Sequence, residues 1–324
     1  MLRTWRTPLI RALGLCAILL AAGCGSTSTR APAPTLAPGG GTGRIAYTCR
    51  DTSSSAAINI CTSNLDGTGA LQLTRVSDAQ DALAPRWSRD GNRILFQVQT
   101  SANVSDSDVY EVLSDGSGQV NLTNNPTAHN GGAAWSPDSQ RIVFHAQRDA
   151  AYTELYVMDA DGGNVQRLSQ GIWAQFPDWS PDGSRIVFMG NMKPATGEDD
   201  WDLYVVAADG SGQRTLITEL GLDAGPVWSP DGNKILYTGP AGPPKTSAQF
   251  ECFVVNTDGS GKKQLTHTSD GSSTCGDWSP DGSKIIFTRT TARGGQVWTM
   301  NADGSAPKQL PNPPGNLGGL VWQP

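Results

Sequence analysis

Short apolar runs alternate with polar turns along residues 44–324. The string "WSPDGSRIVF" at residues 179–188 has close relatives that begin at Trp87, Trp135, Trp228 and Trp278. An alternating segment such as "ELYVMDADGGNVQRLS" at residues 154–169 follows each copy. Runs of β-branched and aromatic residues bounded by Asp-Gly predict strand, turn and strand. One repeat therefore predicts four strands, and the chain has no helical period of any length.

The "SPDG" segment has the chemistry of a tight turn. Proline fixes φ, the aspartate can bond back to the backbone, and glycine takes the left-handed conformation. Arg89 replaces the proline in one copy and Ser139 replaces the glycine in another, so we expect these two turns to be weaker. No histidine accompanies the five copies, so we interpret their serines as structural rather than catalytic.

The spacing of the tryptophans predicts the architecture. Trp87, Trp135, Trp179, Trp228, Trp278 and Trp322 recur at intervals of 44 to 50 residues, the period of four-stranded propeller blades. The chain enters at "GRIAYTC" without a preceding "WSPDG" and stops at "LGGLVWQP". We therefore predict an all-β fold: a six-bladed β-propeller of four-stranded antiparallel blades over residues 44–324, closed by the C-terminal strand joining the N-terminal blade.

These repeats resemble the propeller repeats of the TolB family, and also the WD-repeat-like propellers of tricorn-type and prolyl-oligopeptidase-type proteases. The likeness covers residues 44–324 and implies the fold; for TolB it also implies a role in the cell envelope. TolB proteins carry an additional N-terminal α/β domain, where this chain has only a polar tether. Partner contacts made through that domain are therefore not expected here.

The N-terminus has the pattern of an export signal. Arg3, Arg6 and Arg11 precede the apolar run "ALGLCAILLAAG", which is too short to span a bilayer. Residues 21–24, "AAGC", resemble the lipobox of bacterial lipoproteins, although the leucine lies one position early. We predict a signal peptide at 1–23, lipidation of Cys24, and a flexible tether at 24–43 that is rich in Ser, Thr, Pro and Gly.

Four cysteines remain in the predicted propeller. An even number in an exported chain suggests two disulfides. From the predicted strand positions we expect Cys49 to pair with Cys61 within one blade, and Cys252 to pair with Cys275 between neighbouring blades.

Composition excludes several classes of function. The net charge is −6, which does not suit nucleic acid as a partner. The chain has no G-x-S-x-G elbow and only three histidines, so we predict no enzymatic activity, no cofactor and no metal site. The acidic segment "GEDDWD" at 197–202 lacks the spacing of a known calcium loop, and we interpret it as solvated.

We expect binding residues at the end of the ring opposite the "SPDG" turns, because the loops there vary in length and chemistry. The candidates are the residues near the mouth of the central channel and one tryptophan of the acidic loop: Asp81, His129, Asn130, Trp173, Phe176, Trp201, Asp223 and Asn316. For the aromatic pair Trp173 and Phe176, packing against a neighbouring loop is an equal alternative.

The sequence thus predicts a monomeric, non-enzymatic lipoprotein of the cell envelope, exported to the periplasm or cell surface, that binds a protein or peptide through its loop-rich face. The alternatives are a propeller that binds glycans or small ligands and, third, a propeller enzyme such as a lyase. The membrane is contacted only through the N-terminal lipid.

Overall fold

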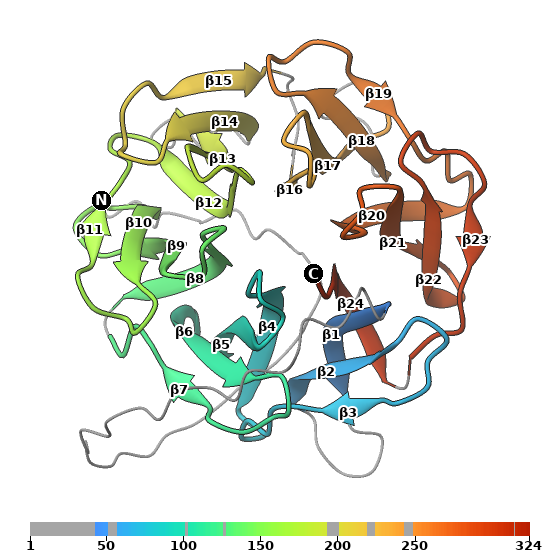
Figure 1. Ribbon diagram of the computed structural model, residues 1–324, viewed down its shortest axis with the longest axis horizontal. Helices are drawn as coiled ribbons and strands as arrows, with labels where there is room; N and C mark the ends of the chain where they lie inside the picture. The colour runs from blue at the N-terminus through green and yellow to red at the C-terminus, as the bar shows by residue number, and fades with distance from the viewer. Residues whose placement is uncertain are drawn as a thin grey trace, which may run out of the picture.

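The protein forms sheets arranged around a central axis (Figure 1). The structure is a computed structural model that describes residues 43–50, 57–100, 103–125, 128–192, 201–218, 224–242, 249–313 and 315–324. In these ranges the chain forms strands and turns and no helix. None of the described residues therefore belongs to a helix that could cross a membrane.

Four of the sheets have four strands each. From the innermost strand outward, the first consists of β24 (Asn316–Trp322), β1 (Arg44–Arg50), β2 (Ile58–Asn64) and β3 (Leu71–Gln72). In the same order, the second consists of β12 (Trp173–Trp179), β13 (Arg185–Asn191), β14 (Asp202–Ala207) and β15 (Arg214–Ile217). The third consists of β16 (Ala224–Trp228), β17 (Lys234–Pro240), β18 (Phe250–Asn256) and β19 (Lys263–Gln264). The fourth consists of β20 (Gly271–Trp278), β21 (Lys284–Thr291), β22 (Gly294–Asn301) and β23 (Lys308–Gln309).

The remaining described strands form one eight-stranded sheet. One half contains β4 (Gln80–Trp87), β5 (Arg93–Thr100), β6 (Asn103–Leu113) and β7 (Val120–Asn121). The other half contains β8 (His129–Trp135), β9 (Arg141–Gln147), β10 (Glu154–Asp159) and β11 (Gln166–Arg167). A parallel bridge between Ser107 of β6 and His129 of β8 joins the two halves.

The prediction of a propeller with six separate four-stranded blades is therefore wrong: four four-stranded blades stand in the ring with one eight-stranded sheet. The cause is the length of β6, whose first half, "NVSDS", is polar and lacks the alternating pattern of a strand. It pairs with β5 and reaches the start of β8. There the Ser107 hydroxyl contacts Nδ1 of His129 at 2.8 Å and donates to the carbonyl of Asn130 at 2.9 Å.

The C-terminal strand closes the ring, as the sequence predicts. β24 lies innermost beside β1, with Trp322 opposite Ile45 and Val321 opposite Ala46. The Thr48 hydroxyl donates to the carbonyl of Gly318 at 2.9 Å. Leu320, Val321 and Trp322 are each at most 6% exposed. The two ends of the described chain thus share one sheet.

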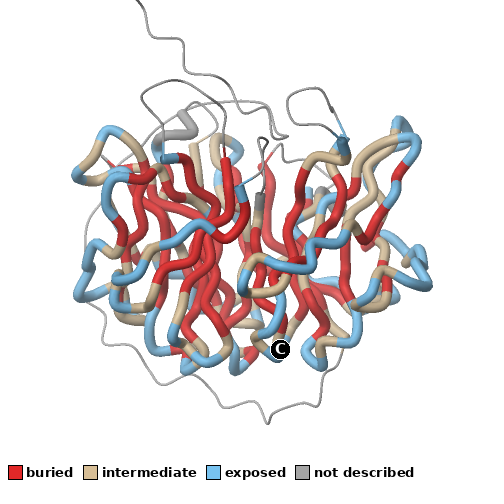
Figure 2. The backbone as a smooth tube through the Cα atoms, turned by 90° about the horizontal axis from the view of Figure 1, so that it is seen from above, coloured by how far each residue is buried: buried red, intermediate tan, exposed pale blue. Residues whose placement is uncertain are grey.

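The tryptophans of the repeats are buried between neighbouring sheets. Trp179 is 0% exposed and packs in a cluster with Phe188 and Tyr204 of its own sheet and with Val143 of β9. Figure 2 shows this buried layer inside an exposed shell of turns. The Arg141 guanidinium carbon lies 4.9 Å above the Trp179 ring, a cation–π contact that adds to the burial. The tryptophans therefore hold neighbouring sheets together.

The "SPD" serines hold turns, as interpreted from the sequence. The Ser180 hydroxyl donates to Oδ1 of Asp182 at 2.6 Å, and its oxygen accepts the backbone N–H of Arg185 at 2.9 Å. The hydrogen bond from Ser180, together with bonds from Ser184, lowers the pKa of Asp182 to about 2. This turn therefore prefers an ionised aspartate, which satisfies the N–H groups that the tight turn exposes.

The two turns that depart from the repeat are linked to each other. Ser139 adopts the left-handed conformation in place of glycine, with φ of 55°. Its hydroxyl oxygen accepts the backbone N–H of Arg89 at 3.2 Å. A proline at position 89 has no N–H and could not make this bond. The two departures are therefore joined by a hydrogen bond, and the expected weakness of the two turns stays a prediction.

A double-mutant cycle tests this link. Arg89→Pro alone should destabilise the fold because the Ser139 hydroxyl loses its donor. Arg89→Pro combined with Ser139→Gly should be less destabilised than the sum of the single variants by about 0.5–1.5 kcal/mol, the net value of one hydrogen bond. Urea unfolding of the four proteins measures the difference. Strictly additive effects would show that the two turns act independently.

Candidate functional site

A bulge interrupts five of the innermost strands. Two of them belong to the eight-stranded sheet, and the other three begin the sheets formed by β12–β15, β16–β19 and β20–β23. Register shifts occur between Leu83 and Arg86 in β4, and between Gln175 and Asp178 in β12; β8, β16 and β20 have equivalent shifts. Bulges bend a strand and re-aim the side chains beside them. In each strand the shift lies directly before the residue that precedes the tryptophan. That residue lines the centre of the ring.

The innermost strands enclose a cavity of about 270 Å³ at the turn end of the ring. Its wall combines apolar and charged residues from β4, β8, β12, β16, β20, β24 and the turns that follow them. The lining residues are Arg86, Trp87, Arg89, Ala134, Trp135, Asp178, Val227, Trp228, Pro230, Asp277, Trp278, Pro280, Val321, Trp322 and Pro324. The cavity therefore lies beside the "SPDG" turns, at the end of the ring opposite the one where the sequence predicts binding residues.

Two carboxylates lie in the wall of this cavity. Asp178 Oδ2 accepts the backbone N–H of Trp228 at 2.8 Å, which links two neighbouring sheets. Asp277 accepts the N–H of Trp278 through Oδ1 at 2.8 Å and the N–H of Trp322 through Oδ2 at 3.1 Å. Burial raises the pKa of both groups, and the nearby Arg86 opposes the rise. Buried carboxylates with raised pKa values are more frequent at functional sites than elsewhere.

Replacing Asp178 with Asn should change how stability depends on pH. Because burial raises the pKa of Asp178 above its ordinary value of 3.8, the folded state holds the proton more tightly than the unfolded state. The resulting stabilisation is complete below about pH 4 and is lost as the pH rises through the folded-state pKa. The asparagine of the variant can still accept the N–H of Trp228, but it does not ionise, so its stability does not fall with the ionisation of residue 178. The free energy of unfolding of the variant should therefore increase relative to that of the wild type as the pH rises from about 4 to neutral.

Urea unfolding at a series of pH values measures this prediction. Asp277→Asn should behave in the same direction, because burial is also the largest cause of its raised pKa. Parallel profiles for the wild type and both variants would contradict the raised pKa values.

At the loop-rich end, three of the predicted binding residues are buried and engaged. Asp81 is 5% exposed and accepts the N–H of Ile58 at 2.9 Å. Asn130 is 0% exposed and donates to Oδ1 of Asp108 at 3.1 Å, while its own oxygen accepts from Arg148. Trp201 is 1% exposed, with its ring centroid 4.8 Å from that of half-buried Trp173. The two indole rings therefore pack against each other.

His129 and Phe176 come together around His145. The ring centroids of His129 and His145 are 5.4 Å apart, and those of His145 and Phe176 are 5.5 Å apart. The backbone N–H of Phe176 donates to Nδ1 of His145 at 3.3 Å. Burial, and secondarily His129, hold the pKa of His145 well below 6.5. Phe176 is 37% exposed and has φ of 48°, which is unusual for a bulky residue.

The remaining predicted residues are not tested by the structure. Cys24, Asp223 and residues 197–200 of the acidic segment lie outside the described residues, as do the signal and tether. Asn316 begins β24, but its side chain is not described. Within the described ranges, no cluster of three or more His, Cys, Asp or Glu residues could hold a metal ion. Binding through the loop-rich residues stays a prediction.

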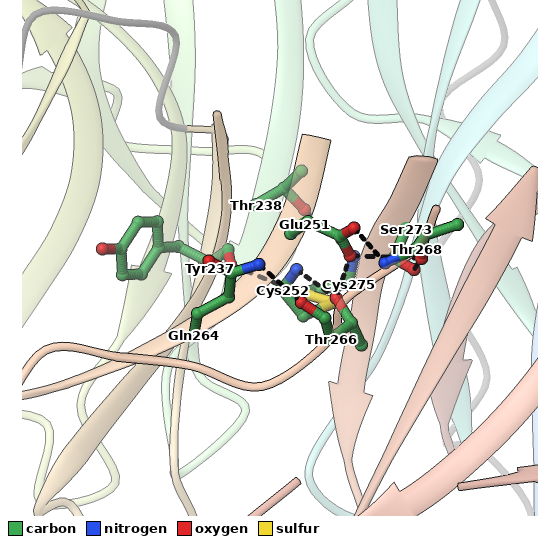
Figure 3. The surroundings of a disulfide bond; sticks show 9 residues. All are labelled: Tyr237, Thr238, Glu251, Cys252, Gln264, Thr266, Thr268, Ser273 and Cys275. Carbon is green, nitrogen blue, oxygen red and sulfur yellow. Dashed lines mark hydrogen bonds between the residues drawn. A yellow bond between two sulfur atoms is a disulfide. The ribbon is translucent and has the colours of Figure 1, made fainter. Parts of the chain in front are cut away.

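Both predicted disulfides are present. Cys49 bonds to Cys61 between β1 and β2, with Cα atoms 5.8 Å apart. Cys252 of β18 bonds to Cys275 of β20, with Cα atoms 5.4 Å apart, so this bridge staples two neighbouring sheets. Figure 3 shows buried Glu251 beside it, where its carboxylate accepts from Thr266 and Thr268. The bridge therefore lies beside a buried network of hydrogen bonds.

Sequence reasoning missed the charged cavity. The signal was present in the residue before each tryptophan, which is Arg86, Ala134, Asp178, Val227, Asp277 and Val321 in turn. This position is charged in three repeats and apolar in the other three, which distinguishes it from the uniformly apolar positions of the repeat. Arg89, at a position otherwise held by proline, carried the same signal.

Comparison with known proteins agrees with this architecture. The family model described as the TolB beta propeller domain matches residues 35–324. The Tol-Pal system protein TolB of Anaeromyxobacter dehalogenans is 33% identical over 93 residues, which are 29% of this chain and 20% of TolB. An uncharacterized peptidase of Bacillus subtilis, YuxL, is 26% identical over 120 residues, which are 36% of this chain and 18% of the peptidase. These matches therefore span about a fifth of each relative.

Solved structures share the fold at low identity. TolB from Acinetobacter baumannii superimposes with a TM-score of 0.71 at 22% identity, covering 89% of this chain and 68% of that chain. An oligogalacturonate lyase in complex with manganese has a TM-score of 0.52 at 14% identity, and the match covers 85% of this chain and 74% of the lyase. The match of the family model over most of the sequence places this chain in the TolB β-propeller family.

Proposed function

We propose that this chain is a non-enzymatic scaffold that binds a polypeptide at the mouth of its central cavity, exported and held at a membrane by a lipid on Cys24. The observation that carries the proposal is the cavity at the turn end, into which the innermost strands bring two arginines, buried Asp178, half-buried Asp277 and apolar walls. The charged groups stand at positions that hold alanine, valine or proline in other repeats, so their presence around one cavity suggests a role in binding.

The likeness to TolB is what supports a binding role, although one relative is named a peptidase. TolB relatives bear the name of a Tol-Pal system component, and the manganese-bound lyase shares only the fold, at 14% identity. The two disulfides suit an oxidising compartment outside the cytoplasm. Cys24→Ala should move the protein from the membrane to the soluble exported fraction, and an unchanged membrane fraction would contradict the lipid anchor.

Site-specific photo-crosslinking in intact cells tests the binding role and its location. A photoreactive amino acid at Pro280, which lines the cavity, should trap a polypeptide of defined mass. The matched control carries the same amino acid at Met192, which is 53% exposed and follows β13 at the loop-rich end. Adducts at Met192 and none at Pro280 would move the binding face to the loop-rich end. Recovery of saccharide without a polypeptide adduct would favour the glycan-binding alternative.

A further inference from the structure

The side chains of Arg86 and Arg89 lie in the wall of the cavity with hydrogen-bonding capacity to spare. Arg86 is half-buried at the end of β4, and Arg89 is exposed in the turn that follows. Both guanidinium charges act on Asp178. Within the described ranges, no hydrogen bond or ion pair joins either guanidinium to a protein group. A guanidinium offers five N–H donors and no acceptor, so the pair presents donors to the cavity.

The carboxylates of the cavity are already engaged by the scaffold. Asp178 accepts the N–H of Trp228, and Asp277 accepts those of Trp278 and Trp322. These bonds tie neighbouring innermost strands together, so the two groups have a structural task. The charged groups available to a ligand are therefore the two guanidiniums. As positively charged hydrogen-bond donors, they favour a negatively charged acceptor.

Both arginines come from one repeat, since Arg86 lies in β4 and Arg89 in the turn that follows it. The equivalents of Arg86 in β8, β16 and β24 are Ala134, Val227 and Val321, and the equivalents of Arg89 are prolines. The rest of the mouth is thus apolar apart from the two aspartates. The volume of about 270 Å³ lies just below the range of about 300–1,000 Å³ for small-molecule sites. It suits an inserted side chain better than a whole drug-sized ligand.

We infer that Arg86 and Arg89 form a clamp for a carboxylate, and that the polypeptide partner inserts an acidic side chain into the cavity. The inference rests on the proposed function and names the chemistry of the partner. Two guanidiniums match the planar carboxylate through paired N–H···O bonds. The apolar wall accommodates the methylene stem of a glutamate side chain. The linked departures at Arg89 and Ser139 preserve the turn while freeing position 89 to carry this arginine.

A small probe tests the clamp without knowledge of the partner. The full chain, labelled with ¹⁵N at arginine Nε, is titrated with N-acetylglutamate α-methylamide to about 10 mM, where even a weak site is occupied. The control ligand is N-acetylglutamine α-methylamide, which has the same shape without the charge. The resonances of Arg86 and Arg89, assigned from Arg86→Gln and Arg89→Gln, should shift only with the glutamate derivative. Equal shifts at exposed Arg75, or no shift at either cavity arginine, would overturn the clamp.

Crosslinking separates this inference from the proposed function. Arg86→Gln combined with Arg89→Gln should reduce the polypeptide adduct at position 280 about tenfold or more, the effect of losing charge-assisted hydrogen bonds. Arg75→Gln, which removes an exposed charge outside the cavity, should leave the adduct unchanged. An adduct that is insensitive to the double substitution would overturn the clamp while the binding role stands. Probe shifts without any adduct would leave the clamp standing and refute the polypeptide-binding role.

Discussion

Deleting residues 317–324 should leave the protein without a stable propeller. The deletion removes Leu320, Val321 and Trp322, which are each at most 6% exposed and pack in two different clusters of the core. Burial of three such side chains contributes roughly 5–8 kcal/mol, which is comparable to the whole free energy of unfolding of a typical domain. The deletion also exposes the inner edge of β1, a template for edge-to-edge association. Thermal unfolding and size-exclusion chromatography should show an aggregated or unfolded chain.

The matched control lacks only Pro324, which is exposed and makes no pairing in β24. It should retain the unfolding temperature of the wild type. If the larger deletion also unfolds at the wild-type temperature, β24 does not close the ring in solution.

Trp179→Ala should cost about 3–5 kcal/mol, the range for removing a large aromatic side chain from a core. The ring is 0% exposed, packs between two sheets, and lies under the Arg141 guanidinium. The change therefore opens a cavity at a sheet interface and also removes the cation–π contact. Urea unfolding measures the loss, which is a large share of the stability of an average domain.

Trp179→Phe serves as the control for the shape of this site. It keeps an apolar ring of smaller volume, so it should cost clearly less than the alanine variant. Equal costs for Phe and Ala would mean that the indole nitrogen or its exact outline matters more than the buried area. A cost below about 1 kcal/mol for Ala would contradict the burial of Trp179 between the sheets.

The repeat predicted the local structure because the information for it is local. The "SPDG" turns, the Asp-Gly turns and the alternating apolar runs each lie within ten or so residues, and the structure has strands and turns where these patterns occur. Ring closure could also be predicted, because the first and last segments are complementary parts of one repeat. The disulfide pairs Cys49–Cys61 and Cys252–Cys275 followed from the strand positions.

Other features could be decided only by tertiary structure. The polar first half of β6 has no strand pattern, and it pairs because His129 and Asn130 of the next repeat lie within reach of Ser107. Likewise, Arg89 and Ser139 each break a turn rule when taken alone, and their mutual hydrogen bond exists only when neighbouring turns are side by side. Sequence reasoning foresaw the contacts between repeats that a paired cysteine or a split repeat announces, but not those made by single polar side chains.

By itself, the sequence determined the strands, their turns, the closing strand and the buried tryptophans, because hydrophobic period and turn chemistry act between near neighbours along the chain. The tertiary structure alone decided the number and joining of the sheets and the place of the charged cavity. Arg86, Asp178 and Asp277 come from three separated repeats. They line one cavity because the bulged innermost strands bring equivalent positions of each repeat to the central axis. The distances between those positions depend on the curvature of the closed ring.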